Sequence, residues 1–480
     1  MMQIRGLRWY IVALIFIITC INYIDRSSIG LLVTDFGPRL GITRELYGNV
    51  GTILLCAYTL SQALSGRLYD RFGSRIGFTI SVLVWCGAAM AHGLIQGYAS
   101  FTVCSYFLGL GEAGNWPGAA KVIAEWFPQR ERAIGMAIFN AGASMGGVLA
   151  PLLVARWLDP AIGWRRTFFL VGCLGLLWLA LWLIVYRPMK QHPRLTQQER
   201  DLIEQDQTTS SDLPPPSTSQ LLFMRQTWGI LIARFLVDPV WWLYVLWLPT
   251  YLKDARHLDI KAIGASAWAP YLAAAVGALF GGWLAARLIR FRLSVNAARR
   301  VTIAIAVCLM PVGLFAGRAS TTTGALLCIS VVLFGFQMWI SNVQTLPSDF
   351  FPTNAVGTVA GLGGMAAGIA SIFFIHFTAP MVSRFGYNFV LTLAGLVAPL
   401  AAVLCFSSPA QFVQWRSAHA NAWGSEPRRF ASPNLRWTHA PRAGTASCAA
   451  QNRPCCVLRS DSTESVQPTL PARKSVATQW

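Results

Sequence analysis

Three charged residues of this chain stand in or beside apolar stretches, where a charge is costly. Asp25 and Arg26 lie near the end of an apolar run that begins at residue 9, and Glu112 lies among glycines in another apolar run. A charged side chain at the centre of a bilayer costs about 2.5–3.5 kcal/mol on insertion scales, so such residues usually face a cavity or a partner. We interpret Arg26 as a carboxylate-binding cation and Glu112 as a proton-coupling residue.

Asp25 has two functional interpretations, a second proton carrier or the residue that holds Arg26. The structural alternatives are that Asp25 and Arg26 merely reach the outer membrane interface, and that Glu112 is a permanently protonated hydrogen-bonding group. Adjacent residues point about 100° apart on a helix, so Asp25 and Arg26 can face different neighbours.

Polar and aromatic residues in other apolar stretches form a second group of candidates. Hydroxyl and amide groups can bind ligand hydroxyls, and indole rings can pack on a sugar face, although each such residue alone is more often a packing residue. The candidate binding residues of this group are Tyr58, Asn115, Trp116, Asn140, Trp241, Trp242, Gln337, Trp339 and Asn342. Asp238 joins them because Pro239 removes a backbone hydrogen bond and opens the helix there. Arg234, one turn earlier, can pair with Asp238.

The composition predicts that membrane-spanning helices position these residues. Of 480 residues, 54% are hydrophobic and only 12% are charged, and about 25% charged residues is typical of a soluble domain. The eleven cysteines show no C-x-x-C pair and no metal-ligand spacing, so no disulfide framework or metal site is expected. No nucleophile–base pairing stands out either, so the sequence does not predict an enzyme.

Twelve apolar stretches are long enough to span a bilayer, which takes about 20 residues each. They cover 9–29, 47–66, 76–95, 101–121, 133–155, 166–186, 228–251, 264–286, 301–317, 324–346, 357–380 and 388–407. We therefore predict an all-α polytopic membrane protein with twelve transmembrane helices in two pseudo-symmetric bundles. Its predicted parts are a six-helix bundle at 1–186, a polar cytoplasmic loop at 187–227, a six-helix bundle at 228–407 and a tail at 408–480.

The formal charge of +19 is best explained by orientation in the membrane. The excess of Lys and Arg lies in alternate short loops and in the tail, with no nucleic-acid motif, so lipid and not nucleic acid is the expected partner. This bias predicts that both termini are cytoplasmic. The tail is basic and of disordered composition, and an altered reading frame after residue 407 is the alternative explanation.

The halves of the chain repeat short motifs. Residues 66–73 close the second stretch and the related residues 282–288 close the eighth, while the segment 125–128 recurs at 349–352. Internal repeats in a twelve-helix protein indicate a transporter with a site between its halves near the membrane midplane.

The first of these motifs resembles the cytoplasmic loop signature of the major facilitator superfamily. Its residues here are Gly66, Asp70, Arg71, Gly73 and Arg75, and we interpret them as a gate. The glycines allow close helix approach, while the charged residues can pair and meet helix ends across the interface between the halves. In the second copy Ala286 replaces the acid, which predicts a weaker or differently built gate.

Four further motifs, at 22–27, 109–117, 125–133 and 238–242, resemble the anion:cation symporter branch of that superfamily and, within it, the hexuronate transporters. The resemblance covers about residues 5–407. It implies uptake of a small organic anion, with the proton as coupling ion and no other cofactor, by a monomer in the inner (plasma) membrane. It also implies that Asp25, Arg26 and Glu112 occupy positions used in coupling and anion binding.

This chain departs from the resemblance in the fourth stretch. Many relatives have an additional arginine there, whereas the nearby residues here are Ser105 and Tyr106, so the number of anion-binding cations stays open. The substrate also stays open, with glucarate, galactonate, tartrate or an aromatic acid as alternatives to glucuronate and galacturonate. An exchanger or exporter on the same fold, and a membrane sensor that binds without transport, are the alternative functions.

Overall fold

A computed structural model describes residues 3–150, 152–154, 159–205, 216–259, 262–263 and 266–406. The predicted tail at 408–480 lies outside these residues. Nine stretches of the described chain are long and apolar enough to cross a membrane. Two of them each contain two of the predicted spans, and the span predicted at 101–121 is divided between two shorter helices. The fold is therefore the predicted all-α membrane architecture.

The described residues of the first half form six α-helices. They are α1 (Leu7–Arg39), α2 (Arg44–His92), α3 (Tyr98–Glu112), α4 (Asn115–Trp126), α5 (Arg132–Ala150) and α6 (Asp159–Val185). Thr43 begins α2 by accepting a hydrogen bond from the backbone N–H of Leu46 at 3.3 Å, which satisfies one of the free donors of a helix start. Within α2 the chain turns at Gly73, whose φ of 80° favours glycine. This turn separates the second predicted span from the third.

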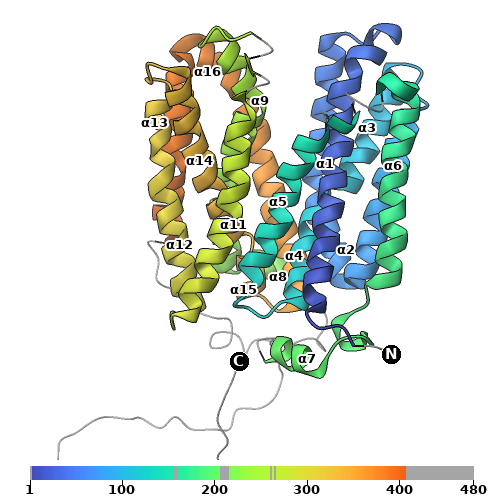
Figure 1. The fold of residues 1–480 in the computed structure, drawn as a ribbon, viewed down its shortest axis with the longest axis vertical. Coiled ribbons are helices and arrows are strands. Elements are labelled where there is room, and N and C mark those ends of the chain that lie inside the picture. Colours follow the sequence, from blue (N-terminus) through green and yellow to red (C-terminus); the bar gives the residue numbers. More distant parts are fainter. Residues whose placement is uncertain are drawn as a thin grey trace, which may run out of the picture. The chain divides into compact units, whose positions relative to one another are not determined.

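The second half follows a connecting segment with the short helices α7 (Gln197–Glu204) and α8 (Thr218–Leu222). Its helices are α9 (Arg225–Asp254), α11 (Trp268–Arg290), α12 (Val295–Leu309), α13 (Gly313–Ala316), α14 (Thr322–Val343), α15 (Leu346–Phe350) and α16 (Val356–Phe406). Gly386, with φ of 74°, divides α16 as Gly73 divides α2. We call the end of the helices at which α7 lies the α7 side (Figure 1).

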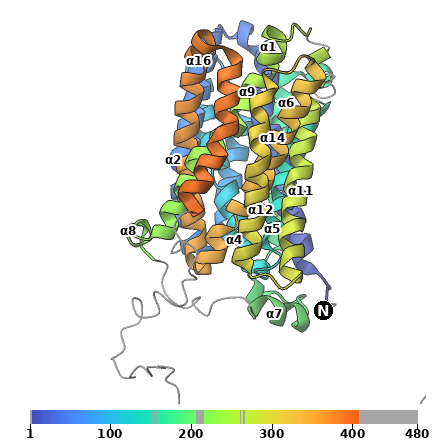
Figure 2. The ribbon, with the colours of Figure 1, turned by 90° about the vertical axis from the view of Figure 1, so that its left-hand side faces the viewer.

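Each half has its own hydrophobic core, and a small cluster of Ala120, Ala124, Val356 and Ala360 lies where α4 meets α16. The halves also touch along α2 and α16 (Figure 2). There Gly66 lies so close to Gly357 that an added Cβ would stand 2.1 Å from the Gly357 carbonyl oxygen. Glycine at this position is therefore a requirement of the contact between the halves.

Two sequence predictions about helix ends are wrong. The first helix continues to Arg39 instead of ending near residue 29, so Asp25 and Arg26 lie near its middle. The span predicted at 101–121 is interrupted after Glu112, although Ala113 and Gly114 keep right-handed helical backbone angles. The cause is Pro117, which has no N–H to donate to the carbonyl group of Ala113.

Candidate functional site: a polar cavity between the halves

A cavity of about 660 Å³, counted with its open mouth, lies between the two halves. The first half contributes Tyr23, Arg26, Leu55, Tyr58, Gln62, Trp116, Asn140 and Ala143 to its lining. The second half contributes Arg234, Asp238, Trp241, Trp242, Phe336, Gln337, Ile340, Gln344, Gly364, Ala367 and Gly368. In the described part of the chain, no group of three His, Cys, Asp or Glu residues could hold a metal ion.

Arg26 and Glu112 form an ion pair at the wall of this cavity. The Nε and Nη2 atoms of Arg26 donate to the same carboxylate oxygen of Glu112, Oε2, at 2.9 and 2.7 Å. Glu112 is completely buried, whereas the Arg26 side chain is 17% exposed. The other Glu112 oxygen, Oε1, has no hydrogen-bond partner among the described residues. The arginine can therefore reach a ligand in the cavity, while the glutamate behind it cannot.

Tightly packed glycines and aromatic rings hold this pair in place. An added Cβ at Gly109 or Gly111 would approach the backbone of α2 to 2.4 or 2.5 Å, so the end of α3 lies directly against α2. The Arg26 guanidinium carbon lies 4.6 Å from the ring centre of Tyr58 and 5.7 Å from that of Tyr23. Such contacts favour the cationic form of the arginine.

Asp25 forms no ion pair with the arginine beside it in the described structure. It is buried, and neither carboxylate oxygen has a hydrogen-bond partner in the described part of the protein. Its polar neighbours are the Trp85 indole and the Glu112 carboxylate. Glu112, and not Asp25, thus holds Arg26, and both residues of α1 lie inside the bundle instead of at the outer interface of the membrane.

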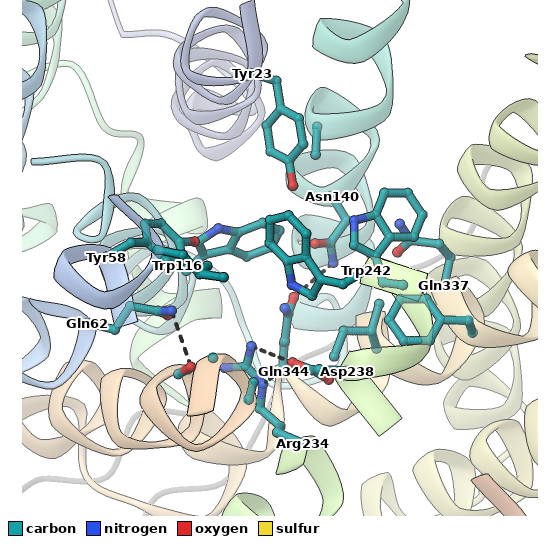
Figure 3. Close-up of a pocket in the computed structure, with 18 of the residues that line it drawn as sticks. Tyr23, Tyr58, Gln62, Trp116, Asn140, Arg234, Asp238, Trp242, Gln337 and Gln344 are labelled. Atoms are coloured by element: carbon teal, nitrogen blue, oxygen red, sulfur yellow. Dashed lines mark hydrogen bonds and ion pairs between the residues drawn. The ribbon is translucent and has the colours of Figure 1, made fainter. Parts of the chain in front are cut away.

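The second half has an ion pair of its own in the cavity. The Nε and Nη2 atoms of Arg234 donate to Oδ2 of Asp238 at 3.0 and 2.8 Å, and its Nη1 donates to the Ala360 carbonyl oxygen at 3.4 Å. The other oxygen of Asp238, Oδ1, is buried with no hydrogen-bond partner among the residues described. Figure 3 shows both side chains from α9 in the lining of the cavity.

Neutral polar side chains join the two halves across the cavity. Gln62 donates to the Gly364 carbonyl oxygen at 3.2 Å, and Asn140 donates through Nδ2 to Oε1 of Gln344 at 3.0 Å (Figure 3). These bonds use amide groups that a hydroxylated ligand could also engage. Trp241 stacks on Phe336, with ring centres 5.8 Å apart, and supplies an apolar part of the wall.

The cavity is lined by eight of the eleven residues that were named from the sequence as candidate binding residues, and their binding of a ligand stays a prediction. The predicted residues that line it are Arg26, Tyr58, Trp116, Asn140, Asp238, Trp241, Trp242 and Gln337. Three others point elsewhere. Asn115 bonds to Thr19, Trp339 is buried in the core of the second half, and Asn342 donates to the Met338 and Gly281 carbonyl oxygens.

The polar residues that the sequence analysis missed in the lining are Tyr23, Gln62 and Gln344, and Arg234 was considered only as a partner of Asp238. Two of them have a helical spacing to a predicted residue, since Tyr23 precedes Arg26 by three positions and Gln62 follows Tyr58 by four. Residues three or four apart share a helix face, so this spacing was an available signal.

Asp70, from the predicted gate, links the halves on the α7 side of the cavity. Its Oδ1 accepts from Lys121 Nζ and from the backbone N–H of Gly357, both at 3.0 Å. Its Oδ2 accepts from the N–H of Thr358 at 2.6 Å. Gly357 and Thr358 belong to the first turn of α16, where free N–H groups and the helix dipole favour a negative charge. Lys121 also donates to the Thr353 carbonyl oxygen at 2.6 Å.

The other predicted gate residues have different surroundings. Gly66 contacts Gly357 and Gly73 forms the turn in α2, as described above. Arg75 donates to the Leu183 carbonyl oxygen at 2.7 Å within the first half, and Arg71 lies over the ring of its neighbour Phe72.

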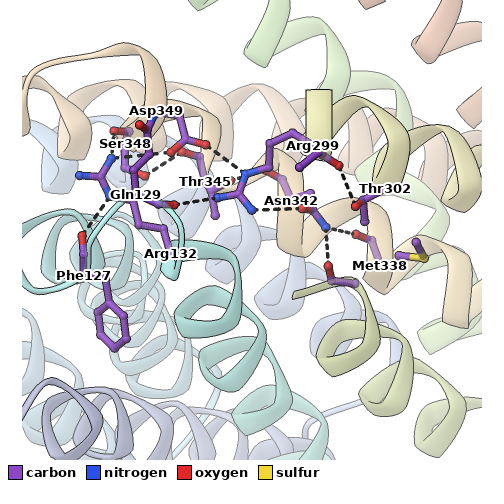
Figure 4. Close-up of polar contacts among 12 residues, drawn as sticks. Phe127, Gln129, Arg132, Arg299, Thr302, Met338, Asn342, Thr345, Ser348 and Asp349 are labelled. Atoms are coloured by element: carbon purple, nitrogen blue, oxygen red, sulfur yellow. Dashed lines mark hydrogen bonds and ion pairs between the residues drawn. The ribbon is translucent and has the colours of Figure 1, made fainter. Parts of the chain in front are cut away.

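A second buried carboxylate, Asp349 on α15, also links the halves (Figure 4). Arg299 of the second half donates to its Oδ2 at 3.1 Å, and Arg132 of the first half lies 3.6 Å from its Oδ1. Arg132 also donates to the Ser348 carbonyl oxygen. The second half thus places an acid on α15, although Ala286 replaces the acid at the end of the repeat motif. The sequence analysis missed Asp349 as a linking residue, even though it had noted that this segment is a repeat of 125–128.

Comparisons with known proteins agree with this architecture. The family model of the Major Facilitator Superfamily matches residues 15–375. A hexuronate transporter of Escherichia coli K12 is 30% identical over 392 residues, which cover 81% of this chain and 90% of that protein. A galacturonate transporter of Dickeya chrysanthemi is also 30% identical, over 66% of this chain and 93% of that protein. Among solved structures, the proton:xylose symporter XylE superposes with a TM-score of 0.66 at 17% identity, covering 83% of this chain and 95% of that one.

Proposed function

The chain belongs to the major facilitator superfamily, and on this premise we propose that it imports sugar acids by proton symport and alternating access. Hexuronates such as galacturonate and glucuronate are the first candidate substrates, supported by the names of the two relatives at 30% identity. We further propose a monomer in the inner membrane, with the α7 side and both termini in the cytoplasm. It is a multi-pass membrane protein whose substrate is a small molecule.

The observation that carries this proposal is the pairing of a cavity-exposed arginine with a fully buried glutamate. A substrate carboxylate that enters the cavity competes with Glu112 for Arg26, because the arginine fork can bind either carboxylate. A glutamate that loses its cation becomes a buried, unpaired charge, which is strongly unfavourable. Glu112 therefore takes a proton from the water of the cavity when the substrate replaces it, and substrate binding is coupled to proton binding.

Asp25 is the second proton-coupling residue of the proposal. A carboxyl group buried without a cation or a donor is stable in its uncharged form, and neither oxygen of Asp25 has a partner in the described structure. Moving one negative charge inward against 100 mV, interior negative, costs about 2.3 kcal/mol. One proton cancels the charge of a monoanion, and a second proton makes the whole cycle favourable at that potential.

Alternating access requires a barrier that can open on each side of the cavity. We propose that the bonds of Asp70 and Asp349 between the halves form the barrier on the α7 side, and that substrate reaches Arg26 from the opposite side in this conformation. Opening on the α7 side must then break these bonds. We propose that proton and substrate binding together provide the free energy for this exchange of conformations.

Reconstituted liposomes test the proposed function directly. With an inward proton gradient, the wild-type protein is expected to accumulate labelled galacturonate, and the Glu112→Gln variant is expected to lose accumulation while it still exchanges substrate across the membrane. Glutamine keeps the shape of the side chain and a hydrogen-bond acceptor for Arg26 but cannot carry a proton.

Retention of exchange is the control for folding in this experiment. Gradient-driven accumulation by the glutamine variant at the wild-type level would refute the role of Glu112. Exchange by the wild-type protein with no response to the gradient would instead identify an anion exchanger, and saturable binding without flux would identify a sensor.

A further inference from the structure

The ion pair of the second half, Arg234 with Asp238, has no task in the mechanism proposed above. It lies in the lining of the same cavity, and both residues are at least nine-tenths buried. A buried ion pair gives little stability compared with apolar packing of the same volume. A pair of this kind in a ligand cavity therefore calls for a functional explanation.

Two features of the pair match those of Arg26 and Glu112. In each, two guanidinium nitrogens donate to one and the same carboxylate oxygen. In each, the remaining carboxylate oxygen is buried and has no hydrogen-bond partner among the described residues. A carboxylate that uses only one of its oxygens is not bound in the two-oxygen geometry that best fits an arginine. A ligand carboxylate can therefore displace it at a modest cost.

The two arginines face one continuous space. The guanidinium carbon of Arg26 lies 4.6 Å from the ring centre of Tyr58, and Tyr58, Arg26 and Arg234 all line the same cavity. Arg234 also lies at the boundary with a smaller adjoining pocket, which it shares with Trp116 and Gln344. Figure 3 shows Arg234 and Gln344 together beside Asp238. A ligand whose one end binds Arg26 can thus present its other end to Arg234.

We propose that Arg234 forms a second anion subsite, and that the ligand class bound most tightly is a sugar diacid with a carboxylate at each end. This inference rests on the proposed function, because Arg26 must bind the first carboxylate. The second carboxylate replaces Asp238 at Arg234, and Asp238 takes a proton from the water of the cavity.

The charges of the cavity support a diacid. Arg26, Glu112, Arg234 and Asp238 have a net charge of zero when all four are ionised. A diacid adds two negative charges, and protonation of Glu112 and Asp238 restores neutrality in a space where net charge is unfavourable. A monoacid needs only the first exchange and leaves the pair of the second half intact.

The alternative explanation is purely structural: Arg234 and Asp238 only stabilise α9 next to Pro239. A pair four positions apart on a helix does this in many proteins. The two explanations differ in one measurable respect. A structural pair affects all ligands alike, whereas an anion subsite affects only ligands with a second carboxylate.

Galactonate and galactarate form a matched pair of probes, since they differ only in a terminal CH2OH or carboxylate group. Calorimetry on purified protein at fixed pH and salt is expected to give at least tenfold tighter binding of galactarate, the scale of one hydrogen bond to a charged group. In the double variant Arg234→Gln, Asp238→Asn this preference should disappear, so that galactarate and galactonate bind within about threefold of each other.

Galactonate binding by the double variant shows that the protein is folded, and Arg234→Lys, which keeps the charge, should keep part of the preference. Equal binding of the two acids by the wild-type protein, or an equal loss of both in the double variant, would overturn the inference. Neither result would affect gradient-driven galacturonate uptake, so failure of this inference is distinguishable from failure of the proposed function.

Discussion

The two halves of the molecule hold their cavity arginines in different ways. In the first half the partners come from different helices, since Arg26 lies on α1 and Glu112 ends α3, 86 positions later. In the second half both partners lie on α9, four positions apart. A pair between helices changes whenever the helices shift, whereas a pair within one helix moves as a unit. The first half is thus suited to couple chemistry to motion, and the second half to recognise a ligand.

The two carboxylates on the α7 side, in contrast to the cavity pairs, have the same effect in both halves. Asp70 and Asp349 come from different halves, yet each binds groups of both. Asp70 accepts from Lys121 of its own half and from the first turn of α16, while Asp349 lies between Arg132 and Arg299. The repeats of the sequence therefore produce different geometry but an equivalent result, a buried acid that ties the halves together.

The largest expected effect comes from neutralising each cavity pair separately. The double variant Arg26→Gln, Glu112→Gln should lower the initial rate of galacturonate uptake in liposomes by more than about 100-fold, because it removes the cation that binds the carboxylate. The matched double variant Arg234→Gln, Asp238→Asn should lower the rate much less, because Arg26 still binds the carboxylate of galacturonate. Equal losses in the two variants would remove the functional distinction between the halves.

A smaller effect is expected at the carboxylates of the α7 side. Asp70→Asn removes the nearer of the two acids beside Lys121, at 3.0 Å against 3.9 Å for Glu125. Asp349→Asn removes the acid that lies between Arg132 and Arg299. Both variants should therefore favour the conformation that is open on the α7 side. We expect a shift of about 2–3 kcal/mol in the conformational equilibrium, below the usual cost of breaking a buried pair because opening exposes the cations to water.

Spin labels at the exposed positions Arg71 and Arg290, in a background without native cysteines, can report this shift as longer label-to-label distances. Arg39→Gln, which breaks an exposed pair with Asp35, is the matched control and should leave the distances unchanged. Unchanged distances in both asparagine variants would show that these carboxylates do not hold the α7 side closed.

The sequence predicted the architecture well because spanning helices must be long and apolar. It also singled out Arg26 and Asp238, two charged residues that line the cavity, since charges in apolar stretches are rare. It could not predict which carboxylate holds Arg26, because Asp25 and Glu112 have the same chemistry and only the packing of α3 against α2 decides between them. Trp339 and Asn342 were misplaced for a related reason. In a helix that is apolar on all sides, the face that meets a cavity cannot be read from the residue types.

The break in the helix after Glu112 was also not predicted, although here the sequence contained a signal. Pro117 lacks the N–H that would continue the hydrogen bonding of the helix, and this consequence was readable from the sequence. The acid on α15 was harder to assign. Its partners Arg132 and Arg299 lie 217 and 50 positions away from Asp349, and no local pattern connects them.

The smallest expected effect concerns the segment that connects the two halves. This segment is attached to the first half. Glu199 on α7 accepts hydrogen bonds from the N–H groups of Leu7 and Arg8. His192 lies close to the Val185 carbonyl oxygen through Nε2, at 3.1 Å, and accepts from the Arg194 N–H through Nδ1. Burial, together with nearby arginines, lowers the pKa of His192 below its ordinary value.

This lowered pKa sets the sign of a pH effect on stability. The unfolded chain binds the proton of His192 more readily than the folded protein, so the contribution of neutral His192 is complete above about pH 6.5 and is lost as the pH falls below that value. Between pH 7.5 and 5.5 the unfolding temperature of the wild-type protein should fall by about 2 °C more than that of His192→Gln, which keeps a donor toward Val185 but does not titrate. If acidification instead destabilised His192→Gln more than the wild-type protein, the sign of the pH effect would be reversed. The hydrogen bond from Arg194 would then not contribute to docking of this segment.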